Sequence, residues 1–155
     1  MIEIEIANHG LKEHQDAIIF LLDNYMHDDM GNRAPMPEEN KVPVLQGLAS
    51  HRESFVLLAK NTQNYVGMAS CFVNFSTFRA RPLINIHDLI VVSGHRNKGI
   101  GRQLLRKVQE IAEQRNCCKI TLEVRVDNHN AKHLYASEEY REGEPPMHFW
   151  SKTLQ

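Results

Sequence analysis

The chain has 155 residues and a formal net charge of −1, with 42% hydrophobic and 24% charged residues. This length and composition predict one globular domain spanning residues 1–155. The near-neutral charge argues against a nucleic-acid partner, and the lack of a long apolar run or a secretory signal argues against membrane and secreted classes. Three cysteines, two of them adjacent, do not make a disulfide framework, so we expect a reducing cytoplasm.

The first half of the chain predicts alternating strands and helices. Residues 1–7 alternate with period two and predict a strand, and apolar residues at helical spacing predict a helix over residues 11–25. After a loop containing Pro and Gly, Pro43 predicts a short turn before a second main helix. Two further strands, over residues 55–60 and 65–75, are joined by a turn of Asn and Thr residues.

The second half centres on a strand–helix–strand unit. A β-branched and aliphatic run predicts a strand over residues 83–92, and an apolar stripe predicts a helix from Ile100. Clean alternation over residues 119–126 predicts the next strand, parallel to the first and joined by a right-handed crossover. A short helix follows, and then a strand beginning at Tyr140 and another over residues 147–154 that closes the sheet. The fold class is α/β, a mixed, twisted sheet with a central parallel βαβ unit and about four helices.

The turn between the central strand and its helix predicts a site for a pyrophosphate. A helix that opens after a glycine-bearing loop presents free N–H groups and a positive dipole end to an anion. Two common phosphate motifs do not fit, because the P-loop needs Lys-Ser or Lys-Thr after its second glycine and the dinucleotide fingerprint needs a glycine where Leu104 stands. The pattern that remains is Arg-x-x-Gly-x-Gly. Its residues are Arg96, Asn97, Lys98, Gly99, Ile100 and Gly101.

This loop resembles the coenzyme A loop of the GNAT superfamily of N-acetyltransferases, and the resemblance extends along nearly the whole order of elements. A second match is Asn128-x-x-Ala-x-x-Leu-Tyr135, and a third is the hydrophobic triplet Leu89, Ile90 and Val91 preceded by His87-Asp88. The chain departs from the family pattern at Glu139-Tyr140, where relatives have Gly-Phe, and at His87, where relatives often have Glu.

The resemblance implies an acetyl-CoA-dependent N-acetyltransferase that moves the acetyl group directly to a primary amine, with no metal. It implies that acetyl-CoA contacts the backbone of Leu89, Ile90 and Val91, the loop of residues 96–101, Asn128 and Tyr135. Tyr135 suits the protonation of the leaving thiolate, because a phenol and a thiol have comparable ordinary pKa values.

The base and the acceptor are left open by the sequence. On a regular strand His87 and Asp88 point to opposite faces, so only one faces the acceptor unless the strand bulges. We assign His87 as the base and Asp88 as the anchor for an ammonium group, with the reverse as the alternative. The acidic residues Asp28, Asp29, Glu38 and Glu39 favour a cationic small molecule.

The sequence also allows other functions, and it bears on a metal site and on the assembly. A protein or peptide amine as acceptor and a non-catalytic acyl-CoA binder are the alternatives to a small-molecule acceptor. His129 and His133 share a helix face as metal ligands do, but no third ligand has matching spacing. The sequence leaves the assembly open, with a homodimer as one arrangement.

Overall fold

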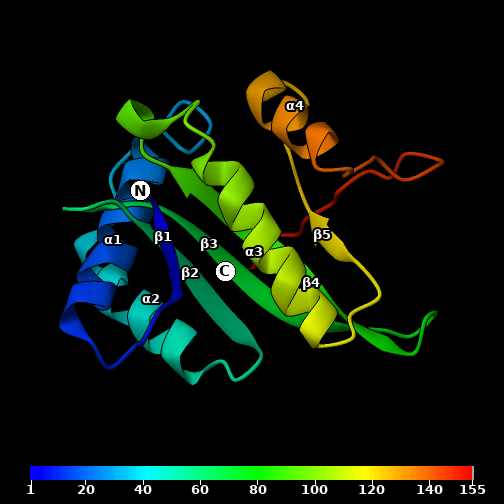
Figure 1. The fold of residues 1–155 in the computed structure, drawn as a ribbon, viewed down its shortest axis with the longest axis horizontal. Helices are drawn as coiled ribbons and strands as arrows, with labels where there is room; N and C mark the ends of the chain where they lie inside the picture. The colour runs from blue at the N-terminus through cyan, green and yellow to red at the C-terminus, as the bar shows by residue number, and fades with distance from the viewer. Residues whose placement is uncertain (155) are drawn as a thin grey trace.

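A computed structural model describes residues 1–154 of the chain (Figure 1). Its sheet has five strands in the order β1-β2-β3-β4-β5. The first four pair antiparallel, and β5 lies parallel to β4. The strands are β1 (Glu3–Ile6), β2 (Ser54–Lys60), β3 (Tyr65–Ser76), β4 (Arg81–Val91) and β5 (Ile120–Leu122). The predicted mixed sheet with a central parallel unit is therefore confirmed.

Helices cover both faces of the sheet (Figure 1). One face packs against α3 (Ile100–Gln114), and the other packs against α1 (Lys12–His27) and α2 (Glu38–Ser50). A short turn of 3-10 helix, η1 (Ser93–His95), joins β4 to the loop before α3, and α4 (His129–Ser137) lies beside the start of α3.

The apolar stripe of α3 is what fixes this helix to the sheet. Its predicted members are all buried, and each fully buried Leu or Ile contributes roughly 1.5–3 kcal/mol. They are Ile100, Leu104, Leu105, Val108, Ile111 and Ala112. The helix ends where predicted, because Asn116 has a left-handed φ of 54° and the N–H of Cys117 donates to the Ala112 carbonyl at 2.9 Å.

Strands β4 and β5 separate after a short paired stretch. Their parallel register runs only from Ile84 opposite Ile120 to Ile86 opposite Leu122. Beyond this point β4 continues to Val91, whereas the chain after Leu122 turns away toward α4. Among residues 1–154, the β5-facing edge of β4 therefore has no strand partner after Ile86. The sheet is open at Leu89, Ile90 and Val91, where the resemblance places acetyl-CoA.

Three expectations about the elements are wrong. The strand expected over residues 119–126 is only Ile120–Leu122, and residues 123–126 are not part of it. Residues 140–154 form no strand, and large apolar side chains of this segment, including Met147 and Trp150, are exposed. A strand needs a neighbouring edge to pair with, and three-residue β5 offers only a short one. Pro43 does not break its helix either: α2 runs continuously through it, on a surface where Glu39, whose carbonyl loses its partner, is exposed to water.

Candidate active site

The separation of β4 and β5 forms a cleft of about 420 Å³. It gathers residues that lie far apart in the sequence, from α1, β4, the chain after β5, and α4. Among the lining residues are Tyr25, His87, Asp88, Leu89, Asn128 and Tyr135. Five of these six were predicted site residues, so the structure brings the central part of the expected site together.

A bulge in β4 sets the direction of His87 and Asp88. Ser70 of β3 pairs with Asp88 and the next residue pairs with Ile86, so His87 is the extra residue. The Ser70 hydroxyl donates to Asp88, and the His87 ring packs edge-on against Phe72 with 5.6 Å between the ring centroids. Ser70 and Phe72 both belong to the face covered by α1 and α2, because they alternate with residues of the α3 face. The bulge therefore brings both candidate bases to one face.

Tyr135 approaches the cleft from α4. Burial raises its pKa to about 12, and the neighbouring Tyr25 adds to the rise. The phenol therefore stays protonated across the neutral and moderately alkaline range, as a proton donor must.

Tyr25, in the last turn of α1, is a cleft residue that the sequence analysis missed. Burial raises its pKa, and the nearby carboxylates of Asp88 and Asp28 raise it further. It lies 63 positions from Asp88 in the chain, and a tyrosine at the end of an amphipathic helix carries no local signal of a site.

The loop between β4 and α3 presents a run of free backbone N–H groups. Within residues 1–154, the N–H of Arg96 donates to Ser93 at 3.3 Å, and the next backbone N–H with a protein acceptor is that of Gln103, which donates to Gly99 at 3.0 Å. The intervening N–H groups, residues 97–102, thus remain available at the N-terminus of α3. This is the arrangement that binds a phosphate group.

The two glycines of this loop are needed for different reasons. Gly99 caps α3 with a left-handed φ of 77°, which side chains rarely adopt, although a Cβ there would meet nothing within 4 Å. A Cβ on Gly101 would lie 3.0 Å from the Leu134 side chain of α4. Gly99 therefore shapes the loop, and Gly101 lets α4 approach α3.

The basic side chains of the loop are held by protein groups. The Arg96 Nε donates to the Val91 carbonyl at 3.0 Å, and its guanidinium is ion-paired with Asp28 at 2.5 Å. The Lys98 Nζ donates to the Gly94 carbonyl at 3.0 Å. Ile90 is 2% exposed, so only its backbone can face a ligand, as the resemblance implies.

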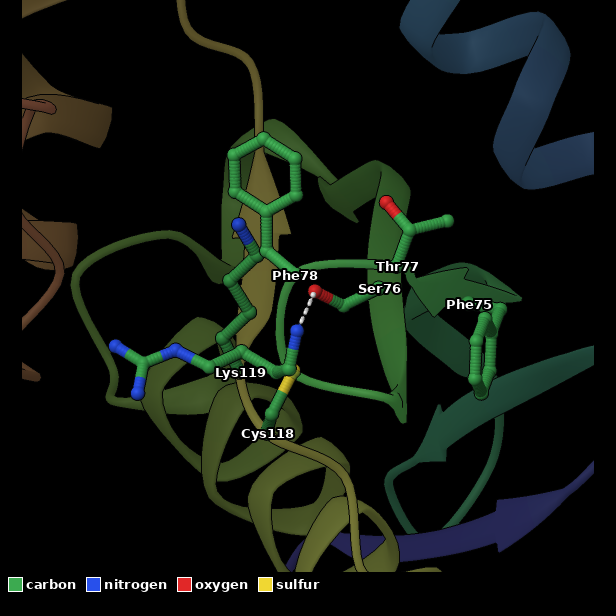
Figure 2. A pocket seen from close by; sticks show the side chains of 7 residues that line it. Phe75, Ser76, Thr77, Phe78, Cys118 and Lys119 are labelled. Carbon is green, nitrogen blue, oxygen red and sulfur yellow. Dashed lines mark hydrogen bonds between the residues drawn. The ribbon is translucent and has the colours of Figure 1, made fainter.

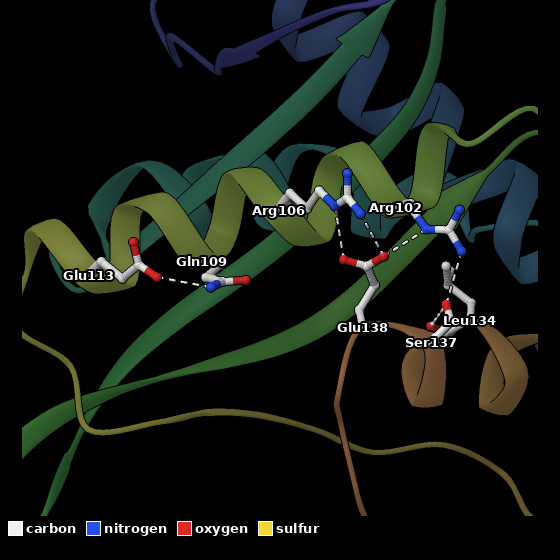
Figure 3. Close-up of polar contacts among 7 residues, drawn as sticks. All are labelled: Arg102, Arg106, Gln109, Glu113, Leu134, Ser137 and Glu138. Atoms are coloured by element: carbon white, nitrogen blue, oxygen red, sulfur yellow. Dashed lines mark hydrogen bonds and ion pairs between the residues drawn. The ribbon is translucent and has the colours of Figure 1, made fainter.

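Ion pairs hold α4 against α3 (Figure 3). Glu138, just after α4, accepts from the Nε of Arg102 at 2.7 Å and from the Nε of Arg106 at 3.0 Å. Arg102 also donates to the Ser137 hydroxyl at 3.0 Å. The hydrogen bond from Arg106, followed by that from Arg102, lowers the pKa of Glu138. These contacts fix the helix that carries Tyr135 relative to the loop of residues 96–101.

Asn128 begins α4 as its N-cap. Its side-chain oxygen accepts from the N–H of Ala131 at 3.1 Å. The side-chain oxygen of this predicted cofactor residue is therefore already bonded within the helix start.

Most of the acidic residues expected to attract a cation are paired with the protein's own cations. Asp28 pairs with Arg96, Asp29 with Arg33 at 3.2 Å, and Glu38 with Lys41 at 2.6 Å. The carboxylates that line the cleft are instead Asp88 and Glu123, and Arg125 lines it with them.

A second hollow, also of about 420 Å³, lies at the far end of the sheet (Figure 2). It is formed by the turn between β3 and β4 together with the start of β5, and its wall includes Phe78, Ser76 and Lys119. The Ser76 hydroxyl accepts from the N–H of Arg79 at 3.3 Å. No predicted site residue lies there. Within residues 1–154 no helix is long and apolar enough to cross a membrane, and no group of three or more His, Cys, Asp or Glu is placed to hold a metal.

Comparison with known sequences gives one family match. Residues 20–138 match the model of the acetyltransferase (GNAT) family. An uncharacterized N-acetyltransferase of Bacillus subtilis (strain 168), YhfO, is 28% identical over 105 residues, covering 68% of this chain and 70% of that protein. An uncharacterized N-acetyltransferase of Archaeoglobus fulgidus is 35% identical over 98 residues, covering 63% of this chain and 67% of the other.

Solved structures share the fold at low sequence identity. A probable acetyltransferase superposes with a TM-score of 0.85 at 19% identity, covering 99% of both chains. The aminoglycoside acetyltransferase meta-AAC0020 from an uncultured soil metagenomic sample, crystallised with sisomicin, superposes with a TM-score of 0.82 at 17% identity, covering 99% of this chain and 97% of that one.

Proposed function

The chain belongs to the GNAT family of acetyltransferases and is an N-acetyltransferase, and we propose that it transfers the acetyl group of acetyl-CoA directly to a primary amine of a small molecule. The observation that carries this proposal is the cleft between β4 and β5, which Tyr135, His87 and Asp88 line, together with the free N–H groups of residues 97–102 in the loop and first turn of α3 that follow β4. The family generally uses acetyl-CoA, and this arrangement suits its two ends, the pyrophosphate and the thioester.

The pyrophosphate of acetyl-CoA binds the N–H groups of residues 97–102 and the free donors of Arg96. The pantetheine arm then follows the unpaired edge of β4 from Val91 toward Leu89, because that edge has backbone groups without a strand partner. This path brings the thioester to the part of the cleft that Tyr135 and Asp88 line. Holding the thioester beside the amine supplies much of the rate enhancement.

Transfer requires three proton and bond changes. An alkyl amine arrives protonated at neutral pH, so Asp88 binds the ammonium group and His87 accepts one of its protons, directly or through a water. The neutral amine attacks the thioester carbonyl, the C–N bond forms and the C–S bond breaks. Tyr135 donates its proton to the departing thiolate, and the second proton that the attacking nitrogen loses as the amide forms restores the phenol.

The acceptor is expected to be a cationic small amine. The support is Asp88, a carboxylate in the cleft with Tyr25 beside it, because an aromatic face and a carboxylate together favour an ammonium group. Aminoglycosides are amines of this kind, and the soil aminoglycoside acetyltransferase has the same fold.

The test is the release of free thiol from acetyl-CoA in the presence of panels of cationic, neutral and anionic amines and of peptides. We expect cationic small amines to react best, with rates that fall as salt rises. Faster reaction of peptides would move the acceptor to a protein amine. Tight acetyl-CoA binding with no turnover of any amine would make the protein an acyl-CoA binder.

A further inference from the structure

An ion pair joins the loop of residues 96–101, the proposed phosphate-binding loop, to the end of α1. Asp28 and Arg96 are 68 positions apart in the chain, and their charged groups lie 2.5 Å apart. The Asp28 side chain is 19% exposed, so this pair is more sheltered than the neighbouring pair between Asp29 and Arg33, whose side chains are 81% and 74% exposed. The shelter matters because fully exposed pairs contribute little to holding a geometry.

Asp28 is itself held firmly. Its second carboxylate oxygen accepts from the N–H of Met30 at 2.9 Å, and its own N–H donates to the Tyr25 carbonyl at 3.0 Å. The following chain winds tightly against the helix end, since a Cβ on Gly31 would lie 2.2 Å from the Tyr25 carbonyl oxygen. The hydrogen bond from Met30, followed by that from Arg96, lowers the pKa of Asp28. The carboxylate is therefore a fixed, charged acceptor.

Two hydrogen bonds consequently hold the Arg96 side chain. Its Nε is bonded to the Val91 carbonyl and one terminal nitrogen to Asp28, so the planar guanidinium has a defined orientation. A guanidinium carries five N–H donors, and those not directed at Val91 and Asp28 remain for a ligand. A side chain that is already ordered loses less rotamer freedom when it binds.

We propose that Asp28 is a positioning residue for cofactor binding, which holds Arg96 in place and joins the phosphate-binding loop to the acceptor side of the cleft. This inference rests on the proposed function. Binding of a pyrophosphate fixes Arg96, Arg96 steadies Asp28, and Asp28 is bonded to the backbone of Tyr25, which lines the cleft. Cofactor binding thus orders the segment that contacts the amine.

The carboxylate also has an opposing effect, because a negative charge near a pyrophosphate repels it. In this scheme Arg96 lies between the Asp28 carboxylate and the pyrophosphate, and it neutralises Asp28 at contact distance. The repulsion between Asp28 and the pyrophosphate acts over a longer distance, where salt screens it. We therefore expect the ordering of Arg96 to dominate.

The first experiment measures the binding of coenzyme A by calorimetry in wild type, Asp28→Asn, Asp29→Asn, Arg96→Ala and the double variant Asp28→Asn/Arg96→Ala. Asp28→Asn is expected to raise Kd about threefold to tenfold, since one rotamer-rich side chain loses its order. Asp29→Asn removes the same charge from the next residue, and its Kd is expected to stay within about twofold of wild type. On the Arg96→Ala background, Asp28→Asn is expected to change nothing further.

The second experiment follows hydrogen exchange of residues 28–34 with and without coenzyme A. Added ligand is expected to slow exchange there in wild type and in Asp29→Asn, and to leave it unchanged in Asp28→Asn. A merely structural role of Asp28 would alter exchange in both conditions alike.

Several results would overturn the inference. One is Asp28→Asn binding coenzyme A as tightly as wild type or more tightly, and another is an equal effect of Asp28→Asn with and without Arg96. Failure of the wild type to bind coenzyme A would instead refute the proposed function, and this inference with it. If thermal melting shows that Asp28→Asn is unfolded, Arg96→Ala still decides, because it must then abolish the protection of residues 28–34 by coenzyme A.

Discussion

The two sides of the cleft are built from different parts of the chain. The proposed cofactor side is mostly backbone, namely the free N–H groups of residues 97–102, a left-handed Gly99 and the unpaired edge of β4, with Arg96 as its charged side chain. The proposed acceptor side is made of side chains, namely His87 and Asp88 on the bulge and Tyr25 on α1. Backbone groups are nearly the same in every residue, whereas side chains can be exchanged one at a time. The cofactor side should therefore respond mainly to changes of its shape and to loss of the pair between Arg96 and Asp28, and the acceptor side should respond to each change of chemistry.

The largest effect should come from the acceptor side. His87→Ala is expected to lower kcat/KM at least about 10²-fold, because general-base catalysis contributes about 10²–10⁴-fold. The matched control is His51→Ala, since His51 packs edge-on against the same Phe72 ring at 5.1 Å but does not line the cleft. Retained activity in His87→Ala, with turnover lost in a folded Asp88→Asn variant, would exchange the two roles.

Tyr135→Phe is expected to lower kcat about 10²-fold and to leave the Kd for acetyl-CoA unchanged. The pKa of about 12 keeps Tyr135 protonated below that pH, so the ratio of wild-type to variant kcat should stay constant from about pH 6 to about pH 10. Tyr140→Phe is the control, because burial also raises the pKa of Tyr140 to about 12 and its ring lies 6.0 Å from that of Tyr135. Full activity of Tyr135→Phe would make Tyr135 a packing residue.

A change of shape at Gly101 should weaken cofactor binding at least as much as the loss of the Asp28 charge does. Gly101→Val is expected to raise the Kd for acetyl-CoA about tenfold, because the new side chain meets Leu134 and displaces α4 from the loop. Gly94→Ala is the control, as a Cβ there meets nothing within 4 Å. Calorimetry showing wild-type affinity in a folded Gly101→Val protein would place the pyrophosphate elsewhere.

The smallest effect is expected at the ion pairs between α3 and α4. Glu138→Gln should lower the free energy of unfolding by about 1 kcal/mol at pH 7, the upper range for pairs with exposed arginines. Since folding lowers the pKa of Glu138, this stabilisation is present above the ordinary pKa of a glutamate and is lost as the pH falls through the lower folded value, so the two proteins should converge below that folded pKa. Thermal melting measures it, with Glu110→Gln as control at an exposed pair. A difference that does not shrink as the pH falls below the ordinary glutamate pKa would contradict this prediction.

Local patterns predicted the structure of α3 and of the loop before it well. The stripe of α3, the glycines of its loop and the cap at Asn116 all depend on residues within one turn or one helix, so the sequence contains the whole argument. The parallel pairing of β4 and β5 followed from the length of the crossover and is confirmed.

The acceptor side was predicted less completely, because it depends on pairing between distant segments. The bulge that turns His87 and Asp88 to one face exists only in the register of β4 against β3. Tyr25 reaches the cleft only because α1 crosses the sheet. The expected C-terminal strands were wrong for the same reason, since a strand over residues 147–154 would need a longer neighbour than three-residue β5.

The short pairing of β4 and β5 also affects how the protein behaves at high concentration. A sheet edge with many unpaired N–H and C=O groups recruits strands from other molecules and leads to aggregation. Here the outermost strand, β5, is only three residues long, so an incoming strand would gain few hydrogen bonds before the chain turns away. The outermost strand is therefore a blunt edge that disfavours edge-to-edge association, while the longer unpaired stretch of β4 lines the cleft.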